Sequence, residues 1–395
     1  MLTTNIIKNY KYICATGLLF ALVAQSYAEP KKEPEIRQIV PPKLDDAHIS
    51  KEVLCHRPMR RGAPNMSVEK LGRQVVAHNY GHGGSGWTLA LGAATYVNRL
   101  LFAFKDARSL KRKTPITIIG GGVLGLFTAY DLVQNGFKNI TIVAESFESL
   151  PSHKAGALLA PASMDNSPEM QPIIDQIGFD TYKFYEAIAK KQHKDFKEGA
   201  SILPAYFDNR EYSDLEPYVV GKVMQPAKDV ILDFGNGTKR NMVVYEDGIY
   251  IDTPKMMAGL TTYLKDKKVK FIKQKVSKFT EIRDRYVINC SGMGARDLNE
   301  DDEMVSVQGH LILLKDQSPK DLQYMIASGY KEGKSKSGHQ MHRLFYQFPK
   351  HLPDSGPNDV GVIGGTMIEG ATEQTPNKEE FANILKEAKD FYGIK

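Results

Sequence analysis

The clearest pattern of apolar and polar positions lies between residues 116 and 143. Residues 116–119 form a short apolar run typical of a buried strand, and the glycine-rich stretch 120–125 predicts a tight turn. Helical spacing then continues to about Asn135 and ends at Gly136, and residues 140–143 form a second apolar run. A helix between two buried strands predicts a parallel sheet, so this region indicates an α/β fold.

Apolar patterning elsewhere predicts further elements of the same fold. The stretch 87–104 is long and apolar, but it contains Asn98 and Arg99, so a buried helix is a better interpretation than a membrane span. The other elements expected are strands over 269–276 and 286–289, a turn over 290–294, a helix that begins at Thr253-Pro254 with the threonine hydroxyl as its cap, and a helix over 377–392.

The first 28 residues have the pattern of a secretory signal peptide. Lys8 and Lys11 precede an apolar run of about 12 residues, shorter than the roughly 20 that span a membrane, and the small residues Ser26 and Ala28 follow it. Cleavage after Ala28 predicts export to the periplasm or out of the cell, with no membrane span left in the mature chain. Residues 29–49 are charged and proline-rich, which predicts a linker.

Composition and charge narrow the class of protein. The 395 residues are 42% hydrophobic and 25% charged, as in ordinary globular proteins. The formal net charge of +6, which becomes +4 without the two lysines of the signal peptide, is modest and spread along the chain, so no nucleic-acid partner is expected. Three cysteines cannot form a disulfide framework, and whether Cys55 and Cys290 pair stays open.

The turn 120–125 carries the first sign of chemistry. Gly120, Gly122 and Gly125 fit the G-x-G-x-x-G dinucleotide fingerprint, in which glycines permit a tight turn and the close approach of a pyrophosphate to a helix N-terminus. Glu145 follows the second strand, 20 residues after Gly125, where a carboxylate accepts hydrogen bonds from ribose hydroxyls. The sequence therefore predicts a dinucleotide site, although this motif does not distinguish FAD from NAD.

Four other segments narrow that choice. Residues 78–88 read His-Asn-Tyr-Gly-His-Gly-Gly-Ser-Gly-Trp-Thr, and they follow the motif Arg-Pro-Met-Arg at 57–60. Residues 151–161 read Pro-Ser-His-Lys-Ala-Gly-Ala-Leu-Leu-Ala-Pro, and residues 287–298 run from Val-Ile-Asn-Cys-Ser-Gly to Arg-Asp-Leu. These segments resemble, in turn, the signature, the carboxylate-binding arginine motif, the flavin-covering segment and the adenine-side turn of the D-amino-acid oxidase family. The resemblance implies a Rossmann-like FAD-binding domain plus a mixed-sheet substrate domain.

The order of these segments differs from the order in that family. There the arginine motif and the signature lie near the C-terminus, after the fingerprint, whereas here they precede it. The resemblance therefore implies a circularly permuted chain, in which the ends of the folded region near Ser50 and Lys395 are neighbours in space. The implied parts are a permuted C-terminal segment that completes the FAD site (50–110), a Rossmann segment (111–170), a substrate-domain segment (171–245), an FAD-domain segment (246–310) and a second substrate-domain segment (311–395).

The resemblance also assigns residues to substrate and cofactor. Arg57 is implied to bind the substrate carboxylate through its guanidinium fork, with the Tyr346 phenol as a second donor, and His342 stands where the family has a lid tyrosine. His78 and His82 are four residues apart, but the glycines that follow disfavour a helical metal pair, so no metal is expected. The residues implied to contact FAD are Gly83, Gly84, Ser85, Gly86, Trp87, Thr88, Gly120, Gly122, Val123, Leu124, Gly125, Glu145, Ser146, Ser152, Ala157, Leu158, Val276, Ser291 and Gly292.

The activity implied is oxidative deamination of a D-amino acid to an imino acid and then a 2-oxo acid, with O₂ as the second substrate and H₂O₂ as a product. A glycine or secondary-amine oxidase, or a dehydrogenase of the same fold, is an alternative. Another is a catalytically degenerate FAD protein that binds a partner, since the segment order and the lid residue are atypical. Nothing beyond the shared fingerprint favours an NAD-dependent dehydrogenase, and the sequence is compatible with a homodimer.

Overall fold

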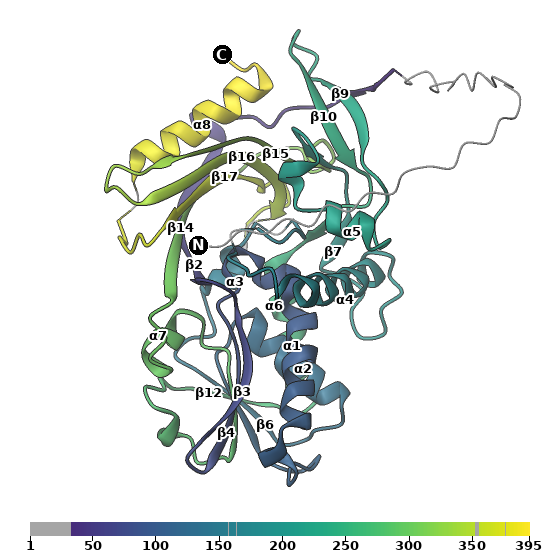
Figure 1. The fold of residues 1–395 in the computed structure, drawn as a ribbon. Helices are drawn as coiled ribbons and strands as arrows, with labels where there is room; N and C mark the ends of the chain where they lie inside the picture. Colours follow the sequence, from purple (N-terminus) through teal and green to yellow (C-terminus); the bar gives the residue numbers. More distant parts are fainter. Residues whose placement is uncertain (1–32, 157, 163, 352–354, 376) are drawn as a thin grey trace, which may run out of the picture. The chain divides into compact units, whose positions relative to one another are not determined.

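The computed structural model describes residues 33–395, except 157, 163, 352–354 and 376 (Figure 1). Residues Pro34–Lys395 form one compact unit that contains a nine-stranded and a six-stranded sheet. The predicted signal peptide, residues 1–28, lies outside the described residues. Among the described helices, none is both long enough and apolar enough to cross a membrane.

The six-stranded sheet contains the predicted βαβ unit. Its order is β12-β6-β5-β13-β4-β3, and every neighbouring pair is parallel except β3–β4. Every residue of β5 and β13 is buried, as expected for short apolar strands in the middle of a parallel sheet. The strands are β3 (Asn65–Leu71), β4 (Gln74–Tyr80), β5 (Ile116–Ile119), β6 (Ile140–Ala144), β12 (Lys270–Lys273) and β13 (Tyr286–Asn289).

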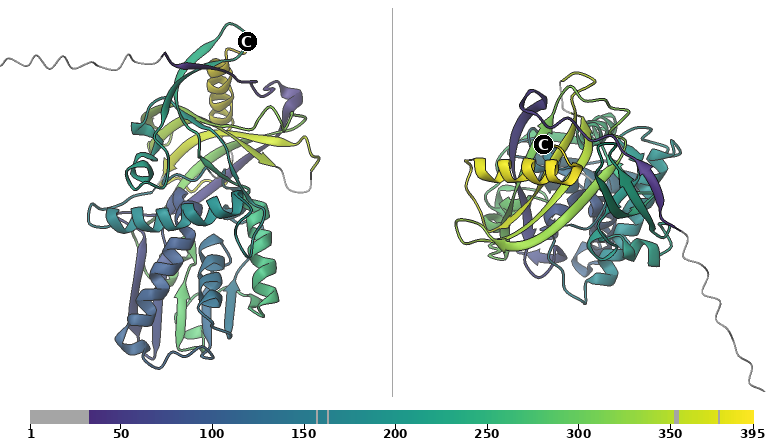
Figure 2. Two further views of the ribbon diagram at one scale, coloured as in Figure 1. Left: turned by 90° about the vertical axis from the view of Figure 1, so that its right-hand side faces the viewer. Right: turned by 90° about the horizontal axis from the view of Figure 1, so that it is seen from above.

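Helices pack beside this sheet and across its boundary with the second one. α1 (Gly86–Ala103) packs on α2 (Val123–Gln134) and on α4 (Gln171–Ala189), which lies across the boundary between the two sheets (Figure 2). A Cβ placed at Gly92 would lie 2.1 Å from the carbonyl oxygen of Ile177, so α1 and α4 cross at a distance that only glycine permits. The other helices here are α3 (Pro151–Lys154), α5 (Glu216–Val220), α6 (Thr253–Asp266) and α7 (Ala295–Leu298).

The nine-stranded sheet has the order β1-β9-β10-β8-β15-β16-β17-β14-β2, so β1 and β2 are its edges. One face is covered by α8 (Lys378–Tyr392), which buries Phe381, Ile384 and Phe391 in a hydrophobic cluster (Figure 1). Its strands are β1 (Glu35–Gln38), β2 (Ile49–Arg60), β8 (Ala205–Phe207), β9 (Lys228–Asp233), β10 (Lys239–Tyr245), β14 (Met304–Leu314), β15 (Met325–Lys334), β16 (Gln340–His351) and β17 (Val360–Glu369), and a separate pair consists of β7 (Ala200–Ile202) and β11 (Ile249–Ile251).

Most elements predicted from the sequence are confirmed. The strands over 116–119, 140–143 and 286–289 correspond to β5, β6 and β13, and the two long helices correspond to α1 and α8. The strand predicted over 269–276 is shorter, because only Lys270–Lys273 pairs with β6. The boundary placed at residue 310 falls inside β14, and Cys55 and Cys290 are buried and free.

Two local predictions are wrong. Residues 29–49 are not a linker throughout, because β1 pairs in parallel with β9 and Leu44 is buried; composition does not reveal pairing with a distant strand. Thr253 does not cap α6, because the neighbouring Asp252 carboxylate accepts the hydrogen bond from the N–H of Lys255 at 3.1 Å. The Thr253 hydroxyl instead donates to backbone carbonyls of residues 153 and 155, each at 3.3 Å.

The two ends of the folded unit lie together. The Tyr324 hydroxyl donates to the carbonyl of Val40 at 2.9 Å and lies 3.3 Å from the hydroxyl of Tyr392. Ile49 and Ile394 pack against the same hydrophobic cluster beneath α8. The start of the folded unit at Val40 therefore lies beside its C-terminal helix. The closeness expected of Ser50 and Lys395, and the permutation that motivated it, stay predictions.

A rearranged chain tests whether the fold depends on the present segment order. We expect a chain cut between Leu110 and Lys111, with residues 41–110 placed after Lys395 through a short linker, to fold with nearly native stability. The cut falls beside the exposed residues 111–113, and the new junction joins ends that are already close. Moving a connection mainly changes loop entropy, so the melting temperature measured by circular dichroism should fall by less than about 10 °C.

The control is residues 41–395 in the present order, which isolates the loss of β1. A rearranged chain that does not unfold cooperatively, when this control does, would show that the segment order is required for the fold.

Candidate functional site

Four segments singled out by their sequence meet at one edge of the six-stranded sheet. The parallel strands β4, β5, β6 and β13 end at Tyr80, Ile119, Ala144 and Asn289. Each is followed by one of the predicted segments: the signature, the fingerprint, Glu145 and the turn 290–294. Because parallel strands present their carboxyl ends at the same edge, the fold brings the four together there.

The fingerprint turn requires its glycines. Gly120 has a φ of +121°, and a Cβ there would lie 2.1 Å from the carbonyl oxygen of Cys290. A Cβ at Gly125 would lie 2.0 Å from the carbonyl oxygen of Gly120, so the start of α2 packs directly on the turn. Gly122 is the N-cap of α2 and has no side chain to satisfy the helix N–H groups. The first of them, at Val123, donates to the Ser152 hydroxyl at 3.1 Å, and Leu124 follows half-buried.

The end of β6 is followed by an exposed carboxylate and a half-buried aromatic side chain. The Glu145 side chain is 72% exposed and lies 3.9 Å from the Lys275 ammonium, a pairing that contributes little in water. The Ser146 hydroxyl is used inside its own turn, where it donates to the carbonyl of Glu148 at 3.0 Å. Phe147, which the sequence analysis missed, covers the fingerprint: its ring would lie 2.6 Å from a Cβ at Gly121.

Side chains of the signature hold the predicted flavin-covering region. We call residues 152–162 the covering segment; Ala157 within it lies outside the described residues. Ser85 donates to the carbonyl of residue 162 at 3.0 Å, Trp87 to that of residue 152 at 2.9 Å, and Thr88 to that of residue 160 at 2.8 Å. Leu158 pairs with Tyr250 of β11. The side chains of Ser85, Trp87 and Thr88, three predicted cofactor contacts, are therefore hydrogen-bonded to the backbone of the covering segment. The neighbouring glycines 83, 84 and 86 can offer only backbone groups to a cofactor.

His82 provides a test of whether this edge fits a cofactor. Its side chain is 1% exposed, and neither ring nitrogen has a hydrogen-bond partner in the described part of the chain. Burial lowers the pKa of His82 to about 3, so the ring is neutral. The starts of α1 and α2 lie together nearby, since a Cβ at Gly86 would be 3.7 Å from Val123. An unpartnered buried imidazole and two adjoining helix N-termini fit a polar, anionic ligand such as a dinucleotide.

The residues predicted on the adenine side follow β12 and β13. Val276 packs, half-buried, on the cluster that contains Val287, and the Ser291 hydroxyl donates to Oδ1 of Asn289 at 2.6 Å. Gly292 has a φ of +58°, and a Cβ there would lie 3.5 Å from the ring of Pro58. The arginine motif therefore contacts this turn, which connects the cofactor edge to β2.

The predicted substrate residues meet on the nine-stranded sheet. Arg57 lies on β2 and Tyr346 on β16, with β14 and β17 between them, and both side chains are half-buried. Arg57 Nη1 donates to the carbonyl of Thr366 at 3.2 Å. Burial raises the pKa of Tyr346 to about 12, although the guanidinium of Arg57 opposes the rise. The phenol is therefore a protonated donor beside the guanidinium.

Two glycines on the intervening strands make this meeting possible. A Cβ at Gly309 of β14 would lie 2.5 Å from Nη1 of Arg57, and a Cβ at Gly364 of β17 would lie 2.6 Å from the Tyr346 hydroxyl. Both long side chains thus lie over backbone that carries no side chain. The sequence analysis missed both glycines, because their role depends on the pairing of strands far apart in the chain.

The substrate residues also contact the covering segment. Tyr346 stacks on Phe348, with ring centroids 4.8 Å apart and planes 13° from parallel. A Cβ at Gly156 of the covering segment would lie 2.7 Å from the Phe348 ring and 3.8 Å from the Tyr346 ring. Gly156 therefore allows the covering segment to close directly on the strand that carries Tyr346.

His342 lies in the β15–β16 hairpin. Its Nδ1 shares a hydrogen bond with the Tyr330 hydroxyl and lies 3.8 Å from the Glu332 carboxylate. These contacts belong to the hairpin, and its role in a lid stays a prediction. Within the described residues, no group of three or more His, Cys, Asp or Glu side chains is arranged to hold a metal ion.

Comparison with protein families identifies the cofactor. Residues 115–394, more than half of the chain, match the family model described as FAD dependent oxidoreductase. The chain belongs to this family. FAD is accordingly its cofactor, which fits the unpartnered His82 and the paired helix N-termini. The match begins just before the fingerprint and ends near the C-terminus, so the arginine motif and the signature lie outside it.

Several solved structures are similar to this chain at low sequence identity. A glycine oxidase from Geobacillus kaustophilus has a TM-score of 0.51 at 15% identity, over 71% of this chain and 78% of that one. A glycine oxidase from Bacillus cereus has a TM-score of 0.49 at 17% identity, and the match covers 70% of this chain and 77% of that one. An L-proline dehydrogenase from P. horikoshii has a TM-score of 0.49 at 15% identity, and the match covers 72% of this chain and 78% of that one. At these identities the first of the three supports the fold alone.

The exposed carboxylate after β6 generates a prediction. We expect Glu145→Ala to weaken FAD binding at least about tenfold, because hydrogen bonds between a carboxylate and ribose hydroxyls are of the stronger, charge-assisted kind. The dissociation constant is measured from the quenching of flavin fluorescence on binding. Glu148→Ala, an exposed carboxylate three residues later, is the matched control and should bind FAD as the native protein does. Native affinity in Glu145→Ala would remove Glu145 from the site.

Proposed function

We propose that this protein is an FAD-dependent oxidase that converts D-amino acids to imino acids, and thereby to 2-oxo acids, with release of H₂O₂. The observation that carries the proposal is the meeting of the Arg57 guanidinium and the Tyr346 phenol over Gly309 and Gly364. A planar fork of N–H donors with a hydroxyl donor beside it suits a carboxylate. The α-carboxylate is the group that all amino-acid substrates share.

Bound FAD supplies the hydride acceptor and the electrons that reduce O₂. The contribution of the chain is to bind, orient and enclose the substrate. Arg57 and Tyr346 would hold the carboxylate, and Phe348, stacked on Tyr346, gives the same space an apolar wall. Gly156 lets the covering segment close on this wall. Two donors on the carboxylate and an apolar wall beside it restrict how the bound substrate can turn, and such restriction favours one enantiomer.

Two other functions are compatible with the same residues. A glycine or secondary-amine oxidase, or a dehydrogenase, would use the same carboxylate-binding pair, and the similar structure from Geobacillus kaustophilus is a glycine oxidase. A protein that binds FAD and a partner without turnover is the alternative from another class. It is motivated by the atypical segment order and by His342 at the lid position.

The order of the segments and the N-terminus lead to two further proposals. We propose that the chain is circularly permuted relative to its family, supported by the family match over 115–394 and by the closeness of the two ends. We also propose that residues 1–28 direct its export, a proposal that rests on their sequence alone.

A substrate panel tests the proposed activity. We expect anaerobic bleaching of the bound flavin by D-amino acids, and peroxide formation in air, with slower or no reaction for L-amino acids, glycine and sarcosine. The restricted orientation of the bound substrate is the physical reason for discrimination against L-amino acids. Glycine and sarcosine have no side chain to contact the apolar wall at Phe348, which is the reason for their slower reaction. Absorbance of the flavin and a coupled peroxide assay are the measurements. Faster reaction with glycine or sarcosine would replace the proposed substrate class. Bleaching of the flavin without peroxide formation would indicate a dehydrogenase. A yellow protein whose flavin no amine bleaches would favour the function of binding a partner without turnover.

The carboxylate-binding role of Arg57 gives a separate prediction. We expect Arg57→Ala to raise KM at least about 30-fold, because it removes a charged hydrogen-bond donor from a partly buried site. Flavin content per protein should be unchanged, since Arg57 lies on the nine-stranded sheet, whereas the fingerprint lies on the other. Steady-state kinetics and the flavin absorbance measure the two quantities. The control is Arg61→Ala, because Arg61 is 52% exposed and forms a salt bridge with Glu369. An unchanged KM in Arg57→Ala would refute the assignment of Arg57 to carboxylate binding.

A further inference from the structure

A lysine outside the carboxylate-binding pair lies on the same strand as Tyr346. Lys350 of β16 is only 3% exposed. Lys350 lies two residues after Phe348 on β16 and, like Phe348, it contacts the covering segment. Carboxylate binding by Arg57 and Tyr346 gives this buried cation no role.

The Lys350 ammonium joins three parts of the chain. It donates to the carbonyl of His153 at 3.1 Å and to that of Ala155 at 2.9 Å, both in the covering segment. Its third hydrogen bond goes to the hydroxyl of Thr253, at the start of α6, at 2.8 Å. All three acceptors are neutral, so a charge is held in the interior without a carboxylate in direct contact.

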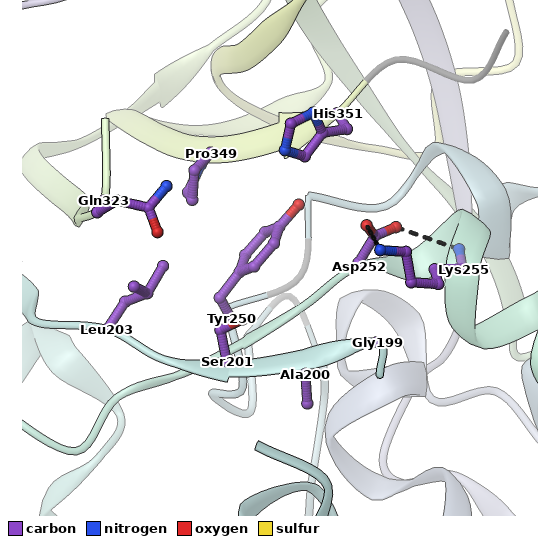
Figure 3. Close-up of a pocket in the computed structure, with 10 residues that line it drawn as sticks. All are labelled: Gly199, Ala200, Ser201, Leu203, Tyr250, Asp252, Lys255, Gln323, Pro349 and His351. Atoms are coloured by element: carbon purple, nitrogen blue, oxygen red, sulfur yellow. Dashed lines mark hydrogen bonds and ion pairs between the residues drawn. The ribbon is translucent and has the colours of Figure 1, made fainter. Parts of the chain in front are cut away.

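The surrounding ionisable groups define the electrostatics. Burial lowers the pKa of Lys350 to about 8, although the carboxylate of Asp252 opposes the shift. The pKa of His153 is itself lowered, by burial and then by the Lys350 ammonium. Asp252, Lys255 and His351 line a neighbouring cavity of about 150 Å³, where Lys255 lies against Asp252 (Figure 3). Lys255 is 54% exposed and therefore serves as a matched lysine outside the buried contact.

The same covering segment reaches the fingerprint. Ser152 accepts the first N–H of α2, at Val123, and its carbonyl accepts from Trp87. The segment that Lys350 contacts therefore also contacts the N-terminus of α2, where the fingerprint would meet the pyrophosphate of FAD. We propose that Lys350 is a positioning residue: its side-chain nitrogen holds the covering segment against β16 while FAD is bound, and it becomes exposed to water whenever the segment opens to release FAD.

Burial of Lys350 in the closed segment determines the sign of a pH dependence of FAD release. In the closed segment the pKa of Lys350 is about 8, and once exposed it returns to its ordinary value of about 10.4. The open form then binds more protons than the closed form, so protonation favours opening, and opening becomes harder as the pH rises through 8. His153 titrates below this window, because its pKa is lowered from an ordinary value of about 6.5. The hydrogen bonds of Trp87 and Ser152 involve groups that do not titrate in this range, so breaking them adds no pH dependence to opening.

The rate of FAD release tests the inference without any substrate, so it is independent of the proposed amine oxidation. Holoenzyme is diluted into buffers from pH 7.5 to 9.0, and release is followed by the rise in free-flavin fluorescence. We expect the native rate to fall about tenfold over this range, as the shift between the two pKa values requires. Lys350→Arg keeps its charge and Lys350→Met has none, so both should change less than about twofold. Lys255→Met should keep the native fall.

Amide hydrogen exchange of the holoenzyme provides a second readout. Protection of the backbone amides of residues 152–156, corrected for the intrinsic effect of pH, should rise about tenfold between pH 7.5 and 9.0 in the native protein, while that of β5 and β13 stays constant. A native release rate independent of pH, or a fall retained in Lys350→Arg, would overturn the proposal. If Lys350→Met does not fold, the native profile and Lys350→Arg still decide between the two outcomes.

Discussion

The substrate site depends on two positions in the middle of a sheet, Gly309 and Gly364, that carry no side chain. β2 and β16 are three strand spacings apart, roughly 14 Å at about 4.8 Å each, which is farther than either side chain could span if it stood upright. Arg57 and Tyr346 meet because Gly309 and Gly364 let them lie flat over β14 and β17. Any side chain at those two positions would fill the space that the guanidinium and the phenol share. The carboxylate-binding pair is therefore a property of four strands in register, not of two residues.

The covering segment carries this geometry from the substrate sheet to the cofactor sheet. The signature holds it through Ser85, Trp87 and Thr88, and β16 holds it through Lys350. These donors all act on backbone carbonyls, so they fix the path of the segment while placing little demand on its sequence. Gly156 is the exception, because a Cβ there would strike the ring of Phe348. The carboxylate donors and the fingerprint are thus connected through hydrogen bonds to one short piece of backbone, as well as through the contact between Pro58 and the turn at Gly292.

How much was visible in the sequence depended on the range of the interaction. The unit β5–α2–β6 was predictable, because its periodicity, its glycines and Glu145 lie within about 30 residues, the usual size of such a unit. Arg57 and Tyr346 were predictable only through resemblance to a family. Gly309, Gly364 and Lys350 carried no local signal, since each matters through a residue on a strand distant in the chain.

Failures at short range have other physical causes. Asp252 and Thr253 are adjacent and both can cap a helix, so the choice between them is made by the carbonyls of the covering segment, which recruit the Thr253 hydroxyl. The strand β1 was hidden because a proline-rich, charged stretch becomes ordered only when β9 supplies the partner for its backbone. The register of β2 against β14 shows the same dependence on distant pairing, here across 250 residues between His56 and Ser306. Closing so long a loop costs little more than closing a shorter one, about 0.6 kcal/mol for each doubling of its length. A ladder that runs the full length of β14 offsets such a cost, so the arginine motif can precede the fingerprint in the chain and still lie beside the turn at Gly292.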